Sequence, residues 1–312
     1  ERQQPAHRGG HHRGAAGHGF QRHQPEGLRP AGHQAHIGGA VVARQQVVRL
    51  WRPEDHPVGQ PELAHPSVAV LFVGAALLAA RPADHDQPGV GRQVGKGLDG
   101  QTMRAMTDQL LAVLDHPDDS ERVHHAFAVL VLSELVRADR IEPMLSQEQR
   151  LTLVTAAAAF MRGIRDYRGF DDTRGWRHQV AHGSDLVLQL AINPAIGEEQ
   201  VAMLLDALAT QIAPARVSYT QGEPERLARA VFFSHQRGLL AEAWWAQWFA
   251  RLSAPPADGE WSRTFQSSAG LAHRHDTLAF LYALHFAASS VDGAQAEALQ
   301  ARVREAITTI LQ

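Results

Sequence analysis

Residues 146–165 read SQEQRLTLVTAAAAFMRGIR, and this stretch decides the fold class. Ser146 followed by Gln149 is the pattern of a capping box, in which two side chains satisfy backbone N–H groups at the start of a helix. The alanine run that follows is strongly helix-forming and lets a neighbouring helix approach closely. The pattern predicts a helix over about 147–165 that packs against other helices.

Helical periods continue through the sequence after about residue 100. Apolar residues recur at three- and four-residue spacing, and no convincing two-residue alternation marks a strand. Proline, glycine and asparagine separate the periodic segments. The periods predict further helices over about 102–114, 120–137 (capped by one of Asp118, Asp119 and Ser120), 175–192, 198–212, 223–237, 240–252, 271–288 and 295–311.

Helices of this length, joined by short loops, pack as antiparallel pairs. We therefore expect an all-α domain over residues 98–312, either a HEAT-like α-solenoid or an irregular helical bundle. No strict repeat is visible in the sequence, so both architectures stay open. The tryptophans at 244, 245 and 248 are expected in its core rather than in a ligand platform.

Residues 1–97 have a different composition. The first hundred residues hold 10 of the 19 histidines, 9 of the 16 prolines and 16 of the 26 glycines, without any helical or alternating period. Three explanations are open: a disordered basic tail, a histidine-rich metal-binding tract, or GC-rich DNA translated in the wrong frame, which we favour. We expect this segment to be largely unstructured and the helical domain to be truncated at its N-terminus.

The composition also narrows the function classes. A formal net charge of -3 argues against an overall nucleic-acid binder. The sequence has no cysteine, which excludes disulfides and thiolate metal sites and fits a reducing cytosol. The longest apolar run, Ser67 to Ala80, is shorter than the about 20 residues that a membrane helix needs. We expect a cytoplasmic protein without a membrane or nucleic-acid partner, and the single lysine and asparagine point to a GC-rich bacterial gene.

Residues 165–185, RDYRGFDDTRGWRHQVAHGSD, form the most unusual segment. On a helix that begins near Gly175, His178 and His182 lie about 40° apart and Asp185 within about 60° of both. Two imidazoles and a carboxylate on one face are a candidate metal ligand set. The same row can be a hydrogen-bonded cluster that joins neighbouring helices, which we favour, or a site for a small molecule or peptide.

Other residues of this segment have expected roles beside the histidines. Asp171, Asp172 and Arg174 are expected to cap and brace the helix start, or to contact an anion there. Trp176 is expected to point away from His178 as a packing anchor. Gln179 stands where the zinc-protease pattern needs its glutamate base, so that enzyme class is excluded. A second histidine pair, at 273 and 275, diverges around its helix and cannot share an ion.

The chain from about residue 98 resembles a bacterial family called domain of unknown function 2785. The resemblance rests on Arg168-Gly169, Gly175-Trp176, His178, Ala181-His182 and Asp185-Leu186, in this order. It implies a helical, HEAT-like domain of unknown activity, and it supplies no catalytic residue or cofactor. Members of that family usually carry further helices before the point at which this chain begins to match.

Two function classes remain. The first is a cytoplasmic helical-repeat domain that acts as a scaffold and binds a protein or small molecule on its concave face. The second is a metal-assisted hydrolase that uses His178, His182 and Asp185.

Overall fold

A computed structural model of the chain describes residues 99–116, 123–172, 175–214, 217–256 and 259–312. The expectations for residues 1–97 and for the helix caps at 118–120 lie outside these ranges. Over the described ranges the chain forms nine α-helices, one 3₁₀ helix and one two-stranded hairpin, which confirms the all-α fold class.

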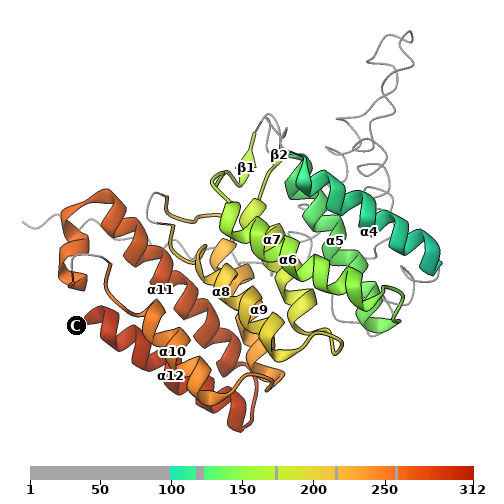
Figure 1. The fold of residues 1–312 in the computed structure, drawn as a ribbon. Coiled ribbons are helices and arrows are strands. Elements are labelled where there is room, and N and C mark those ends of the chain that lie inside the picture. Colours follow the sequence, from blue (N-terminus) through green and yellow to red (C-terminus); the bar gives the residue numbers. More distant parts are fainter. Residues whose placement is uncertain (1–98, 117–122, 173–174, 215–216, 257–258) are drawn as a thin grey trace, which may run out of the picture.

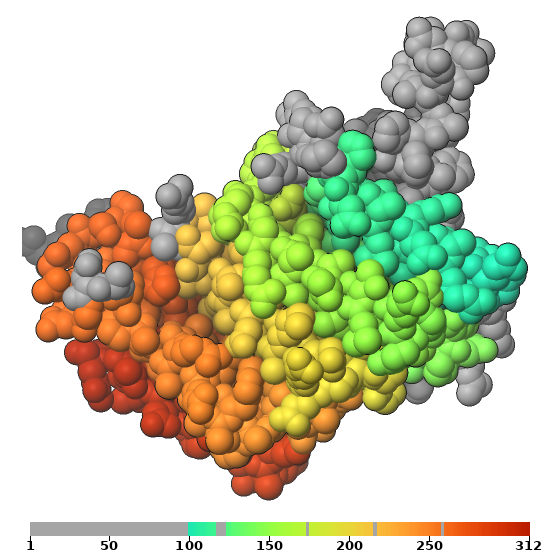
Figure 2. Space-filling model, in the orientation of Figure 1, coloured from blue at the N-terminus to red at the C-terminus, as the bar shows by residue number. Residues whose placement is uncertain are grey.

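The elements follow one another from α4 at the right of Figure 1 to α12 at its lower left. The space-filling view shows the same progression along the molecule (Figure 2). Each of the nine helices predicted from the sequence corresponds to one of α4 to α12. The elements are α4 (Gly100–Asp115), α5 (His124–Ile141), α6 (Gln147–Gly163), β1 (Phe170–Asp171), β2 (Gly175–Trp176), α7 (Gln179–Ala191), α8 (Glu198–Ala209), α9 (Glu223–Gln236), α10 (Glu242–Leu252), η2 (Trp261–Gln266), α11 (Ser268–Ser289) and α12 (Ala294–Leu311).

The odd-numbered helices α5, α7, α9 and α11 form one layer, in which each packs against the next. Helices α5 and α7 run parallel, because contacts join them at both ends. His182 Nδ1 lies 3.1 Å from the carbonyl oxygen of Ala126 near their N-termini. Near their C-termini, Asn193 Nδ2 donates to Asp139 Oδ2 over 3.1 Å.

The even-numbered helices form a second layer on this one. Helix α4 packs against α5 and α6, and α6 packs against α7 and α8. Trp248 on α10 donates its indole N–H to the carbonyl of Leu205 on α8, over 3.4 Å, and α12 packs against α10 and α11. Trp245 and Trp248 are both buried, which confirms the prediction that this cluster belongs to the core.

Helix α7 lies at the centre of the two layers. Eleven of its 13 residues are buried, from Gln179 to Ala191. Gly183 allows α6 to come close, because a Cβ at this position would overlap the sulfur of Met161. The start of this enclosed helix carries the histidines singled out in the sequence, so the surrounding helices fix their positions.

Helix α6 begins with the predicted capping box. The Ser146 hydroxyl accepts from Gln149 N over 3.1 Å, and Gln149 Oε1 accepts from Ser146 N over 3.2 Å. The helix ends at Gly163, two residues before the predicted end. None of the helices over the described ranges is both long and apolar enough to cross a membrane.

Candidate functional site

A hairpin occupies the place where the sequence predicted the first turn of α7. Strands β1 and β2 pair antiparallel, with Gly175 at a φ of 78°. The pairing is extended by Arg177 N, which donates to Gly169 O over 2.8 Å, and by His178 N, which donates to Arg168 O over 3.2 Å. These backbone groups are committed to the hairpin, so the prediction that the helix begins near Gly175 was wrong.

His178 is the N-cap residue of α7 and has a left-handed backbone, with a φ of 43°. Among the described residues it is the only one other than glycine with a positive φ. The conformation costs roughly 1–2 kcal/mol. Its ring stacks on Trp176 with 4.6 Å between the centroids, so the prediction that Trp176 points away was wrong. Residues two apart on an extended strand share one side, whereas the prediction assumed a helix.

Glu223, at the start of α9, lies opposite His178. Its Oε1 is 3.3 Å from His178 Nε2, close enough for an ion pair although the alignment is poor for a hydrogen bond. Its Oε2 accepts from Gln221 N over 2.9 Å. Burial alone would raise the pKa of Glu223, but the contact with His178 and the backbone N–H groups outweigh it and lower the pKa. Glu223 is therefore a buried carboxylate held in its charged form.

His182 is enclosed between α5 and α7. Its ring meets Phe127 edge to face at 5.7 Å and lies 6.0 Å from the His178 ring. Burial lowers the pKa of His182 most, and the charges of His178 and Arg226 lower it further, to about 3. The imidazole is therefore neutral near pH 7, and we assign its proton to Nδ1, where it can donate to the Ala126 carbonyl.

Asp185 lies about two turns into α7 and binds a different neighbour. Arg226 Nη1 of α9 donates to its Oδ1 over 2.7 Å, and the pair is partly exposed. In the part of the chain that the structure describes, no group of three or more His, Cys, Asp or Glu side chains is arranged to hold a metal ion. The structure thus brings His178 and His182 together and joins Asp185 to α9.

The model of a family described as protein of unknown function (DUF2785) matches residues 110–286. The chain belongs to this family. The matched residues run from within α4 to near the end of α11 and include both histidines and Glu223. A search of curated proteins and a search of solved structures each found no match. This match confirms the resemblance seen in the sequence, and the description of the family names no activity.

The acidic residues before α7 do not cap it in this DUF2785 domain, because the helix begins later than predicted. Asp171 lies in β1, Asp172 is exposed in the turn that follows, and the N-cap is His178. Arg174 lies outside the described residues. A contact of Asp172 or Arg174 with an anion stays a prediction.

A second buried carboxylate lies on α11, directly after the histidine pair at 273 and 275. Asp276 is fully buried, and its Oδ1 accepts from Tyr219 N over 2.9 Å. Its Oδ2 has no hydrogen-bond partner among the described residues, and burial raises its pKa to about 6. His273 bonds instead to the Ala213 carbonyl and stacks on Trp261.

Proposed function

We propose that the chain is a cytoplasmic, HEAT-like helical-repeat protein that binds an extended segment of a partner protein on the face of its odd-numbered layer that no described helix covers. The packing of the helices supports this proposal. Helices α5, α7, α9 and α11 lie side by side, and even-numbered helices pack on the other face of the layer, as in stacked helix pairs.

One observation carries the proposal: each odd-numbered helix leaves a stripe of side chains at least partly exposed. The stripes follow three- and four-residue spacing, so each lies on one side of its helix. Hydrogen bonds from Arg140 to Gln189 and from Arg226 to Asp185 join neighbouring stripes. We call this surface the free face. It consists of Leu130, Arg137, Arg140 and Ile141 on α5, Asp185 and Gln189 on α7, Arg226, Arg229 and Phe233 on α9, and His275, Ala279, Tyr282 and Phe286 on α11.

The chemistry of the free face indicates what its partner offers. Phe233, Tyr282 and Phe286 are 40%, 51% and 73% exposed, and large exposed aromatic residues are common anchors of protein interfaces. Over the described ranges, Arg140 and Arg229 have no carboxylate partner. A segment that alternates acidic and apolar side chains would satisfy both features.

Quantitative co-purification from the source cells tests the proposal. Combining Phe233→Ser with Phe286→Ser should reduce at least one partner several-fold relative to the unchanged chain. The matched control combines Leu151→Ser with Met203→Ser, which are 40% and 37% exposed on α6 and α8 in the other layer. Equal partner recovery from both double variants would contradict the proposal, provided that both variants unfold at the same temperature.

The alternative function, a metal-assisted hydrolase using His178, His182 and Asp185, has weaker support. Asp185 is bound to Arg226, and the positive charge of that guanidinium also acts on His182. Both effects oppose a cation at this position. Stoichiometric zinc in the purified chain, lost in His182→Ala, would favour the hydrolase. We expect sub-stoichiometric metal and an unchanged melting temperature in chelator.

A further inference from the structure

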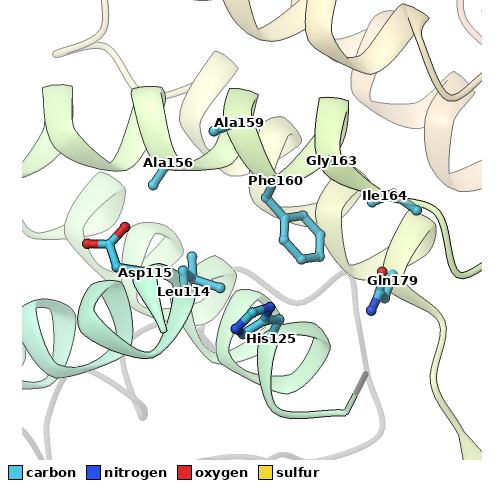
Figure 3. A pocket seen from close by; sticks show the side chains of 9 residues that line it. All are labelled: Leu114, Asp115, His125, Ala156, Ala159, Phe160, Gly163, Ile164 and Gln179. Carbon is cyan, nitrogen blue, oxygen red and sulfur yellow. The ribbon is translucent and has the colours of Figure 1, made fainter. Parts of the chain in front are cut away.

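A cavity of about 230 Å³ lies between the end of α4, the start of α5 and the second half of α6 (Figure 3). Small residues of α6 leave this space open. Ala156, Ala159 and Gly163 follow one another at spacings of three and four, so they share one side of the helix. The cavity therefore lies along a strip of α6 that has almost no side-chain volume.

Apolar and polar atoms supply nearly equal parts of the cavity wall, and His125 and Gln179 are among the polar side chains. Leu114 and Ile164 line it, and Figure 3 shows the Phe160 ring extending from α6 toward His125. The space is open to solvent on one side, because Asp115, Ala159 and Gly163 are exposed. Its volume exceeds the about 150 Å³ that suffices to hold benzene. The space thus fits a single ring with a short chain, and it is small for a drug-sized ligand.

Among the lining residues that the structure describes, the carboxylate is that of Asp115, the last residue of α4. Asp115 is exposed and has no ion pair over the described residues. A carboxylate at a helix C-terminus lies at the negative end of the helix dipole, which is unfavourable, and the last turn of α4 holds no basic residue. A cation in the cavity would relieve this repulsion.

We propose that this cavity binds a small organic ammonium compound, with its ring against Phe160 and the alanine strip and its ammonium group beside Asp115. The inference does not depend on the proposed function, because the cavity lies between α4, α5 and α6 and not on the free face. It names a chemical class: a primary amine on a short chain attached to one ring.

Three probes of matched size test the proposal on the full chain. Benzylamine carries a positive charge at pH 7, benzyl alcohol is neutral and benzoate is negative. Dissociation constants from ligand-observed NMR should place benzylamine first and benzoate last. An exposed ion pair contributes up to about 1 kcal/mol, so benzylamine should bind a few-fold tighter than benzyl alcohol.

Two variants separate the charge from the cavity. Asp115→Asn should remove the preference for benzylamine and leave the affinity for benzyl alcohol unchanged. Ala159→Trp should fill the space and abolish binding of all three probes, whereas Ala250→Trp, at an exposed position of α10, should change nothing. Circular dichroism shows whether each variant is folded. If Ala159→Trp does not fold, the result for Asp115→Asn decides the test.

Several results would overturn the proposal. These are no saturable binding of any probe at millimolar concentration, tighter binding of benzoate than of benzylamine, equal affinity for benzylamine and benzyl alcohol, or unchanged binding in folded Ala159→Trp.

Discussion

At the scale of single residues, His178 combines an unfavourable backbone conformation with three ring contacts. Trp176 stacks on one side, His182 lies edge-on, and Glu223 faces Nε2. A left-handed residue other than glycine persists only where its surroundings stabilise it. We infer that these contacts hold the end of the hairpin against α7 and α9.

The first prediction concerns the pair of His178 and Glu223. His178→Ala should lower the free energy of unfolding by about 1–3 kcal/mol, because the buried Glu223 carboxylate loses its partner. His178→Asn is the control for the backbone, since asparagine tolerates the left-handed region. Urea unfolding of both variants, each with and without Glu223→Gln, measures the coupling. If His178→Ala costs as much with Glu223→Gln as without it, the pairing is not what stabilises this site.

The second prediction concerns Asp276, whose folded-state pKa of about 6 lies above its ordinary value of 3.8. The folded state therefore binds the proton more tightly, and stability is lost as the pH rises through this window. Asp276→Asn keeps an acceptor for Tyr219 N and cannot ionise. The difference in unfolding free energy between Asp276→Asn and the unchanged chain should shift in favour of the variant as the pH rises. From below pH 4 to pH 7 the shift should be on the order of 3 kcal/mol. Denaturant unfolding measures the difference, and a pH-independent difference would contradict the assignment.

Local sequence could predict only part of this site. The four-residue spacing of His178 and His182 is enough to bring their rings together, even though the helix begins only after His178. Glu223 gave no such signal, because an acidic residue in the first turn of a helix is ordinary. Its pairing with His178 arises from the packing of α9 against α7, which no local pattern encodes.

At the scale of elements, Asp139 joins three helices. It lies in the last turn of α5 and accepts from Arg150 Nε and Nη2, from Met144 N and from Leu145 N, all over 2.8 Å. Asn193, just after α7, adds a fourth partner. Burial would raise the pKa of Asp139, but Arg150 and the backbone N–H groups outweigh it and lower the pKa.

The third prediction follows from this joint. Asp139→Ala should cost about 3–5 kcal/mol, because it leaves the Arg150 guanidinium buried without its carboxylate. Asp206→Ala removes a comparable pair with Arg251, which is largely exposed, and should cost at most about 1 kcal/mol. Thermal and urea unfolding of the two variants compare these costs. Similar losses in both would show that Asp139 does not hold the helices together.

Element boundaries were predictable where the signal is local. The Ser146 capping box marks the start of α6 within a single turn. The start of α7 was misplaced because the hairpin pairs residues on both sides of a short turn, and two-residue strands leave no detectable alternation. The 3₁₀ helix η2 was missed for a related reason, since its six residues are too few to show a helical period.

At the scale of the whole molecule, helix periods predicted an all-α domain but not how its helices form layers. The layer that a helix joins depends on which of its sides packs against which neighbouring helix. In the sequence, a stripe that becomes exposed cannot be told from one that becomes buried when both contain apolar residues. Phe233 and Phe286 are examples, because the sequence alone gives no reason to place either at the surface.

Site-specific photo-cross-linking tests the free face most directly. A benzophenone amino acid placed at Phe233 or Phe286 reports what contacts the odd-numbered layer in the source cells, and the same group at Leu151 or Met203 reports on the other layer. We predict that both free-face positions capture the same protein and that neither control position does. Capture from the control positions alone, or identical adducts from all four positions, would contradict a partner-binding function of this face.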